Sequence, residues 1–212
     1  MTRPPSERPF PRGLLAGDTL AAARAVLGAL MVREPDRAGG ERRVGRIVEV
    51  EAYLGPEDRA SHARIGPTPR NRAMFGPPGT AYVYLVYGMH HCLNIVTEPD
   101  GRPAALLVRA AEPVEGLGAM LAARGRAGIA DDRLAAGPGC LGAAFGVDRT
   151  LDGIDLCDPA STLHLAAAPD GEPARAVVAG PRVGIAHAGE PAISRPWRLA
   201  VVGSPSLSRR AP

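Results

Sequence analysis

The segment from residue 44 to residue 53 limits the possible folds of this chain more than any other, because its pattern is that of a β-strand. It is rich in β-branched residues, and apolar side chains alternate with other types along it. Glu49, Glu51 and Tyr53 fall on one side, so that side is acidic and aromatic. Two interpretations are open at this point: a solvated sheet face, or a chemical site built on the strand.

The four tyrosines of the chain gather around this strand. Aromatic residues make up only 4% of the composition, yet Tyr53, Tyr82, Tyr84 and Tyr87 all lie between residues 47 and 94. Core packing alone explains this clustering poorly, and we expect the region to bind something flat. Tyr82 and Tyr84 share one strand face, and Tyr87 falls at the following turn. Such rings hold an extruded nucleobase or wedge into a duplex; the alternative is a tyrosine-rich sheet face packed on a helix.

The remaining segments predict a mixture of helices and strands. Asp18 is placed as the N-cap of a helix over residues 19–30, whose apolar residues recur at helical spacing. A tight connection at residues 87–90 is expected to join two strands into a hairpin. Further strands are predicted at residues 80–86, 91–96, 104–111, 162–165, 176–185 and 197–202, and helices or helical turns at 70–75, 115–123 and 140–145.

Length and the two ends set the expected organisation. A chain of 212 residues suits one domain with a single core, which we place at residues 13–206. Residues 1–12 contain four prolines among polar residues and predict a disordered tail, and residues 207–212 predict a frayed one. No apolar run approaches the roughly 18 to 20 residues of a membrane span, and the start lacks the apolar run of a signal peptide. We expect a cytoplasmic protein with no membrane partner.

Cysteine and histidine usage gives no sign of a metal site or a disulfide framework. Cys92, Cys140 and Cys157 are an odd number without C-x-x-C spacing. His90 and His91 directly precede Cys92, and consecutive side chains on a strand diverge. No metal and no cofactor are therefore expected.

The basic residues are all arginine, and the sequence contains no lysine. A net charge of +3 and a pI near 9.0 fit a polyanionic partner, because the planar guanidinium suits phosphate. Genomic base composition is an equally good explanation for arginine in place of lysine. The absence of lysine also removes the side-chain amine that forms Schiff bases.

Glu51 is the strongest catalytic candidate on the acidic strand face. Alternate strand residues lie about 6.6 Å apart, so Glu49 and Glu51 project side by side. Two-carboxylate glycoside hydrolysis needs its groups on opposite sides of the scissile bond, so one carboxylate would have to act alone, as a base that activates water. Arg109 lies near the end of an apolar strand, where burial requires a carboxylate partner. Glu51 is a candidate partner, and an unpaired surface arginine is the alternative.

Several longer motifs, in order along most of the chain, carry a resemblance to a known family. They include residues 51–58 (Glu-Ala-Tyr-Leu-Gly-Pro-Glu-Asp), 61–62, 68–72, 74–75, 78–84, 87–89, 93–95, 107–113, 137–139, 182–185, 187–190 and 203–205. The chain resembles the alkyladenine DNA glycosylases, also called 3-methyladenine or methylpurine DNA glycosylases.

The resemblance implies a fold and a reaction. The fold is a single mixed α/β domain of the α+β type, with a curved, mostly antiparallel sheet, flanking helices and a protruding hairpin that enters the DNA minor groove. The partner is double-stranded DNA containing damaged purines, and the expected protein is a monomer, associated with the nucleoid if bacterial. The family flips the damaged nucleotide into a pocket and hydrolyses its N-glycosidic bond, which leaves an abasic site.

The same resemblance assigns roles to individual residues. Glu51 corresponds to the general base, and Arg109 with the main chain at Val183 helps to hold the attacking water. The pocket that stacks on and hydrogen-bonds the flipped base corresponds to Tyr53, His62 and Tyr84, with Asn94 disfavouring the 2-amino group of guanine and Leu107 as another wall. Tyr87 fills the gap left in the duplex, and Arg70 and Arg72 contact DNA phosphates.

The chain departs from the family pattern at the hairpin, and two other functions stay open. His90 and His91 follow Met89 where the family often has bulkier aromatics, so the tip is expected to grip DNA differently. A protein that flips damaged bases without cleaving them is the main alternative. A metal-dependent hydrolase is a third, without metal-ligand spacing to support it. The order of preference among 3-methyladenine, 7-methylguanine, hypoxanthine and ethenoadenine does not follow from the sequence.

Overall fold

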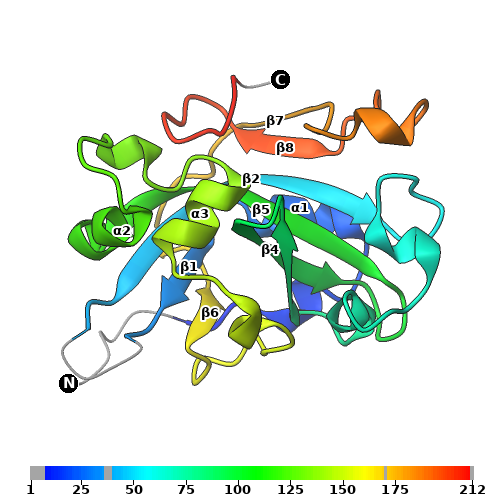
Figure 1. Cartoon of the computed structure of the whole chain (residues 1–212), viewed down its shortest axis with the longest axis horizontal. Helices are drawn as coiled ribbons and strands as arrows, with labels where there is room; N and C mark the ends of the chain where they lie inside the picture. Colours follow the sequence, from blue (N-terminus) through cyan, green and yellow to red (C-terminus); the bar gives the residue numbers. More distant parts are fainter. Residues whose placement is uncertain (1–7, 36–39, 170, 211–212) are drawn as a thin grey trace.

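The computed structural model describes residues 8–35, 40–169 and 171–210 (Figure 1). One eight-stranded sheet runs in the order β3-β4-β5-β2-β1-β6, with β8 on β2 and β7 on β8. Its strands are β1 (Leu30–Arg33), β2 (Arg43–Leu54), β3 (Ala81–Val86), β4 (His90–Thr97), β5 (Ala104–Glu115), β6 (Leu163–Ala166), β7 (Val177–Gly180) and β8 (Arg198–Val201). All of these pairings are antiparallel, which confirms the expected mixed α/β domain.

Three α-helices and six short 3₁₀ segments flank the sheet in the described ranges. They are α1 (Thr19–Val26), α2 (Leu117–Arg124) and α3 (Pro138–Ala144), with η1 (Arg12–Leu14), η2 (His62–Ile65), η3 (Arg72–Phe75), η4 (Asp131–Arg133), η5 (Arg149–Leu151) and η6 (Ala186–Ala188). Helix α1 packs on β2 and β5, and α3 packs on β4 and β5. None of the helices described is long and apolar enough to cross a membrane.

Helix α1 begins where the sequence predicts and ends earlier. The Asp18 side chain accepts a 2.8 Å hydrogen bond from the Ala21 N–H, which confirms it as the N-cap. The expectation that the helix runs to Leu30 is wrong. The helix ends at Val26, Leu27 is already extended with a ψ of 125°, Gly28 takes a φ of +91°, and Leu30 begins β1 between β2 and β6. Apolar periodicity did not distinguish these buried residues from a further helical turn.

Strand β2 lies at the centre of the sheet and has a partner on each edge. One edge pairs with β5 over its whole length, with irregular register on both sides of Glu49. The other edge pairs first with β1 and then, from Glu49 to Glu51, with β8. In Figure 1, β7 and β8 lie above β2, beside the C-terminus. The part of β2 that carries the two carboxylates therefore pairs with a strand from near the end of the chain.

Helix α3 supports the hairpin formed by β3 and β4. A Cβ atom on Gly142 would lie 2.1 Å from the His91 carbonyl oxygen, and one on Gly139 would lie 3.0 Å from the His90 ring. The small residues of α3 allow the backbone of this helix to contact the hairpin directly. The helix predicted from residue 140 thus begins at Pro138, and its glycines hold the base of the hairpin.

Both ends of the described chain are packed, where composition alone predicts tails. Phe10 is buried and its N–H donates to the Leu165 carbonyl, because one aromatic side chain is enough to anchor the segment on β6. At the other end Leu207 is buried and Ser208 hydrogen-bonds Glu49. The remainder of the two predicted tails, residues 1–7 and 211–212, lies outside the described residues.

Candidate active site

Four strands bring four side chains into one row across the sheet. Tyr82 of β3 pairs with Asn94 of β4, Asn94 pairs with Leu107 of β5, and Leu107 pairs with Glu51 of β2. Directly opposed residues of antiparallel strands project from the same face. The row therefore unites residues that lie far apart in the sequence.

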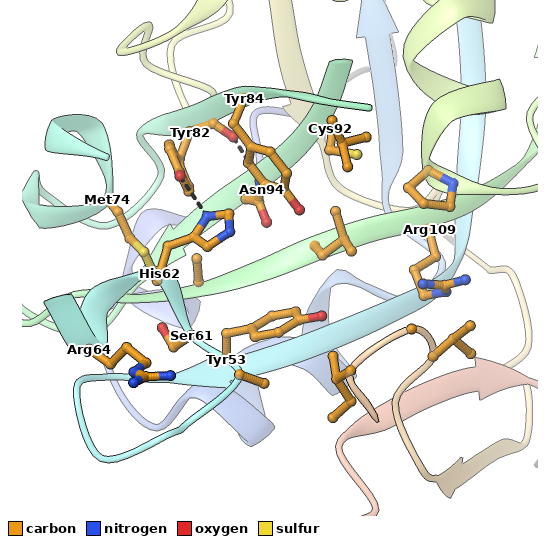
Figure 2. Close-up of a pocket in the computed structure, with 18 of the residues that line it drawn as sticks. Tyr53, Ser61, His62, Arg64, Met74, Tyr82, Tyr84, Cys92, Asn94 and Arg109 are labelled. Atoms are coloured by element: carbon orange, nitrogen blue, oxygen red, sulfur yellow. Dashed lines mark hydrogen bonds between the residues drawn. The ribbon is translucent and has the colours of Figure 1, made fainter. Parts of the chain in front are cut away.

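A cavity of about 480 Å³ opens over this row (Figure 2). This size is typical of small-molecule sites. Among its lining residues are most of those predicted from the sequence: Tyr53, His62, Tyr84, Tyr87, Asn94, Leu107, Arg109 and Val183. Figure 2 shows Tyr53 across the pocket from Tyr84, and Arg109 at the end away from Met74.

The aromatic wall of this pocket is a connected group. His62 Nδ1 lies 2.8 Å from the Tyr82 hydroxyl, and the His62 and Tyr84 rings meet edge to face with centroids 4.7 Å apart. Burial raises the pKa of Tyr82 to about 12. Burial, with Arg70 and His187 nearby, lowers the pKa of His62. The wall is therefore uncharged at neutral pH, with polar atoms at its edge. The sequence did not assign Tyr82 the role of holding His62.

Glu51 is fully buried, so the solvated-face interpretation is wrong for it. Its Oε2 accepts a 2.9 Å hydrogen bond from the Tyr53 hydroxyl, and its Oε1 accepts one of 2.7 Å from the Val183 N–H. Arg109 Nη1 lies 3.2 Å from the same Oε1. Donors from β2, β5 and the loop after β7 fix this carboxylate beside the cavity.

Arg109 is also buried, so the unpaired surface arginine is excluded. Its Nε donates to Glu49 Oε1 at 2.9 Å, while its Nη1 faces Glu51. The guanidinium thus lies between the two carboxylates that alternate on β2. Glu51 as its partner is confirmed, and Glu49 is a second partner that the sequence did not assign.

Glu49 is the centre of a network of hydrogen bonds and ion pairs. It accepts hydrogen bonds from Arg198 Nε at 2.8 Å and from the Ser208 N–H and hydroxyl at 2.6 and 2.7 Å. Burial opposes its charge, but Ser208 and the two arginines outweigh burial and lower the pKa of Glu49. The alternation of Glu49 with Glu51 was the only sequence signal for this residue.

A buried arginine supports Tyr53 and Val183 from behind. The Arg182 guanidinium lies 4.7 Å from the Tyr53 ring centroid and 4.9 Å from that of Trp197. It donates to the Ala52 carbonyl and to both oxygens of Asp58. Arg182 thus contacts Tyr53 and directly precedes Val183, and both of these residues donate to Glu51. Sequence reasoning gave Arg182 no role beyond a matching motif.

The hairpin tip projects apolar side chains into solvent. Tyr87 is 88% exposed with a φ of 52°, and Met89 and Leu85 beside it are exposed too. Arg70 Nη2 donates to the Leu85 carbonyl, which places its charge beside the tip, and Arg72 is exposed at the start of η3. Exposed apolar groups flanked by cations suit an interface with a polyanion.

Within the part of the chain that the structure describes, no three His, Cys, Asp or Glu side chains gather in a way that could hold a metal ion.

Asn94 donates its amide N–H to the Tyr82 carbonyl at 2.9 Å, and Leu107 is buried beside it. These two form the floor of the pocket between the aromatic wall and Glu51.

Residues 14–205 match the family model described as methylpurine-DNA glycosylase. The chain belongs to this family. Relatives named provisionally as 3-methyladenine DNA glycosylases cover nearly all of it. That of Anaeromyxobacter dehalogenans (strain 2CP-C) is 50% identical over 96% of this chain and 88% of its own length. Those of Methanocella arvoryzae and Bacillus cereus (strain G9842) are 48% and 41% identical, over 96% and 94% of this chain and 97% and 98% of their own.

As a member of this family, the protein is a DNA glycosylase. Such an enzyme is a DNA-repair hydrolase with DNA as its substrate. The resemblance stated from the motifs is therefore confirmed at the level of family and enzyme class.

Proposed function

We propose that this enzyme flips alkylated or deaminated purines, of the 3-methyladenine type, out of duplex DNA. It then hydrolyses their N-glycosidic bond with water activated by Glu51. The observation that carries this proposal is one buried carboxylate, held by three donors, beside a cavity with aromatic walls. One reactive carboxylate with a neighbouring flat-walled pocket is what base excision by water requires.

Glu51 acts on the water and the bond breaks at the sugar. A carboxylate oxygen accepts two hydrogen bonds, so Oε2 takes a water proton in addition to the Tyr53 hydroxyl. The water oxygen bonds to C1′, the C1′–N bond breaks with its electrons going to the purine, and Glu51 receives the proton. An alkylated, cationic purine leaves as a neutral base, and a deaminated, neutral purine leaves as an anion that takes a proton from solvent water. Arg109 and the Val183 N–H hold the carboxylate in place, and through it they help to hold the water.

The pocket selects the base by stacking and by shape. Tyr53, His62 and Tyr84 present ring faces and edges to the flipped base, and ring faces attract the positive charge of an alkylated purine. Asn94, held by the Tyr82 carbonyl, and the Leu107 wall leave little room for the 2-amino group of guanine. Unstacking costs less at damaged pairs, which adds selectivity before the chemistry.

The hairpin holds the duplex open. Tyr87 enters the gap that the flipped nucleotide leaves, as apolar wedges do at unstacked steps. Arg70 and Arg72 contact phosphates near the tip. One copy of the chain contains the whole set, so we propose that a monomer acts on double-stranded DNA.

Glu51→Gln tests catalysis against the alternative of flipping without cleavage. We expect wild type to release the base from duplexes that each carry one defined lesion, and Glu51→Gln to bind them but lose release by about 10²-fold or more. Exposed Glu57→Gln is the matched control and should retain activity. Equal release by wild type and Glu51→Gln would refute the role of Glu51. Binding without release by wild type would establish the non-cleaving alternative.

We propose that the bond is cleaved by water and not by a lysine amine, because the chain has no lysine to form a Schiff base. Borohydride added during turnover is therefore expected to trap no covalent protein–DNA adduct. A strong adduct would contradict a monofunctional enzyme.

A further inference from the structure

Every nitrogen of the Arg109 guanidinium has a partner, and only one of the three faces the reaction. Nε lies 2.9 Å from Glu49 Oε1, and Nη2 lies 3.0 Å from the Ser208 hydroxyl. Nη1 lies 3.2 Å from Glu51. Two of the nitrogens are thus held from behind, and the third is directed at Glu51 and the cavity.

Ser208, near the end of the described chain, completes the set of residues that holds Arg109. Ser208 donates both its N–H and its hydroxyl to Glu49, and its hydroxyl oxygen also contacts Arg109. Arg198 donates to Glu49 from the remaining side. Two carboxylates of β2 and two arginines therefore balance one another, and one serine hydroxyl contacts both a carboxylate and an arginine.

The segment that carries Ser208 is itself fastened to the fold. Arg198 Nη2 donates to the Arg210 carbonyl at 2.8 Å, and Arg133 Nη1 donates to the Leu207 carbonyl at 2.9 Å. Leu207 packs with Val48 and neighbouring apolar residues. These contacts hold Ser208 in a defined position behind Arg109.

We propose that Ser208 and Glu49 are positioning residues for the excision reaction. Through them the C-terminal segment holds Arg109 in the orientation that serves Glu51. This inference rests on the proposed role of Glu51. It gives a catalytic purpose to a segment whose composition predicts only a frayed tail.

Loss of the Ser208 hydroxyl frees one edge of the guanidinium. Glu49 keeps its bonds to Arg198, to the Ser208 backbone and to Arg109 Nε, so the fold survives while Nη2 of Arg109 loses its partner and the guanidinium is held less firmly. A misplaced catalytic group lowers the rate of reaction without weakening the stacking that binds the base. We expect Ser208→Ala to lower the single-turnover excision rate by about tenfold, and the affinity for lesion DNA to stay within about twofold.

Ser206→Ala is the matched control. Ser206 is a serine of the same segment and is buried, whereas Ser208 is partly exposed, and the Ser206 hydroxyl has no hydrogen-bond partner in the described structure. Excision rates are measured on a duplex with one deoxyinosine. Affinities are measured on its 2′-fluoro analogue, which resists hydrolysis. We expect Ser206→Ala to excise the base at the wild-type rate. Ser208→Thr keeps a hydroxyl at this position and should retain most of the wild-type rate.

A second measurement does not depend on activity. In ¹⁵N-labelled protein the Arg109 Nη2–H, whose partner is the Ser208 hydroxyl and which is identified by its loss in Arg109→Lys, should be protected from hydrogen exchange in wild type and in Ser206→Ala. It should lose that protection in Ser208→Ala. Excision by Ser208→Ala equal to that of Ser206→Ala, or a loss of rate accompanied by an equal loss of affinity, would overturn the proposal. If Glu51→Gln stays active while Arg109 responds as described, the proposed function fails and the positioning contact stands.

Discussion

The hydroxyl of Tyr53 donates a 2.9 Å hydrogen bond to Oε2 of Glu51, two residues earlier on the same strand. Burial, and then the Glu51 charge, raise the pKa of Tyr53 well above its usual value, so the hydroxyl keeps its proton. Alternation along β2 makes the two side chains neighbours on one face. One tyrosine thus serves both as a pocket wall and as a donor to the proposed base.

Tyr53→Phe separates these two functions. The ring remains, so lesion affinity should change by less than about threefold. The buried carboxylate loses one donor, an effect of about 1–3 kcal/mol, and we expect the single-turnover rate to fall by about 10-fold to 100-fold. Parallel rate and affinity measurements on a duplex with one lesion check this. An unchanged rate would mean that the hydroxyl does not serve the base.

Tyr87→Ala tests the hairpin as a wedge. Because Tyr87 is 88% exposed, the melting temperature should not change, while affinity for lesion DNA should fall by about tenfold or more. Fluorescence anisotropy with a labelled duplex measures this. Val202→Ala, at another exposed apolar residue, is the control and should bind like wild type. Equal affinity of the two variants would argue against insertion of Tyr87.

Asn94→Ser tests discrimination against normal guanine. The smaller side chain leaves room for the 2-amino group, so excision of guanine from undamaged pairs should rise relative to that of hypoxanthine. One added or removed group in a pocket wall is worth about 10-fold to 200-fold. Release of each base from matched duplexes gives the ratio. A fall of both rates by the same factor would show that Asn94 supports the pocket without selecting the base.

The depressed pKa of Glu49 makes stability depend on pH. Its pKa in the folded state lies below the unfolded value near 4.5, so Glu49 stabilises the fold fully above that value. This contribution is lost as pH falls from about 4.5 through the folded-state pKa. In urea unfolding, the free-energy gap between wild type and Glu49→Gln should therefore be constant from pH 7 to about 5.5 and shrink below about 4.5. A gap that is independent of pH would contradict the network around Glu49. Glu57→Gln, at an exposed residue, should show little gap at any pH.

Local pattern was sufficient for several elements of this fold. The alternation of β2, the Asp18 cap of α1 and the hairpin with Tyr87 at its tip all depend on neighbours within a few residues. The apolar pattern did not show that the helix predicted through Leu30 ends earlier, because a buried strand and a buried helical turn have the same apolar composition. Motif resemblance, and not spacing, assigned the pocket residues that the sheet brings together.

The partners of Glu49 could not be predicted, because they come from distant parts of the chain. Arg198 and Ser208 lie 149 and 159 residues further along, and the composition of the C-terminal segment gave no sign of packing. The same holds for Arg182, whose ion pair with Asp58 spans 124 residues. Long-range pairing of charged groups depends on burial, and burial is a property of the folded sheet.

By itself, the sequence determined that Glu49, Glu51 and Tyr53 share one face of a strand, that the tyrosines gather near it, and that no lysine is present. Only the tertiary structure decided that this face is buried, with Arg198 of β8 and Ser208 of the C-terminal segment against Glu49 and with Arg109 between the two carboxylates. The physical reason is that alternation fixes the direction of a side chain, whereas its desolvation and its charge partners depend on which distant strands lie beside it.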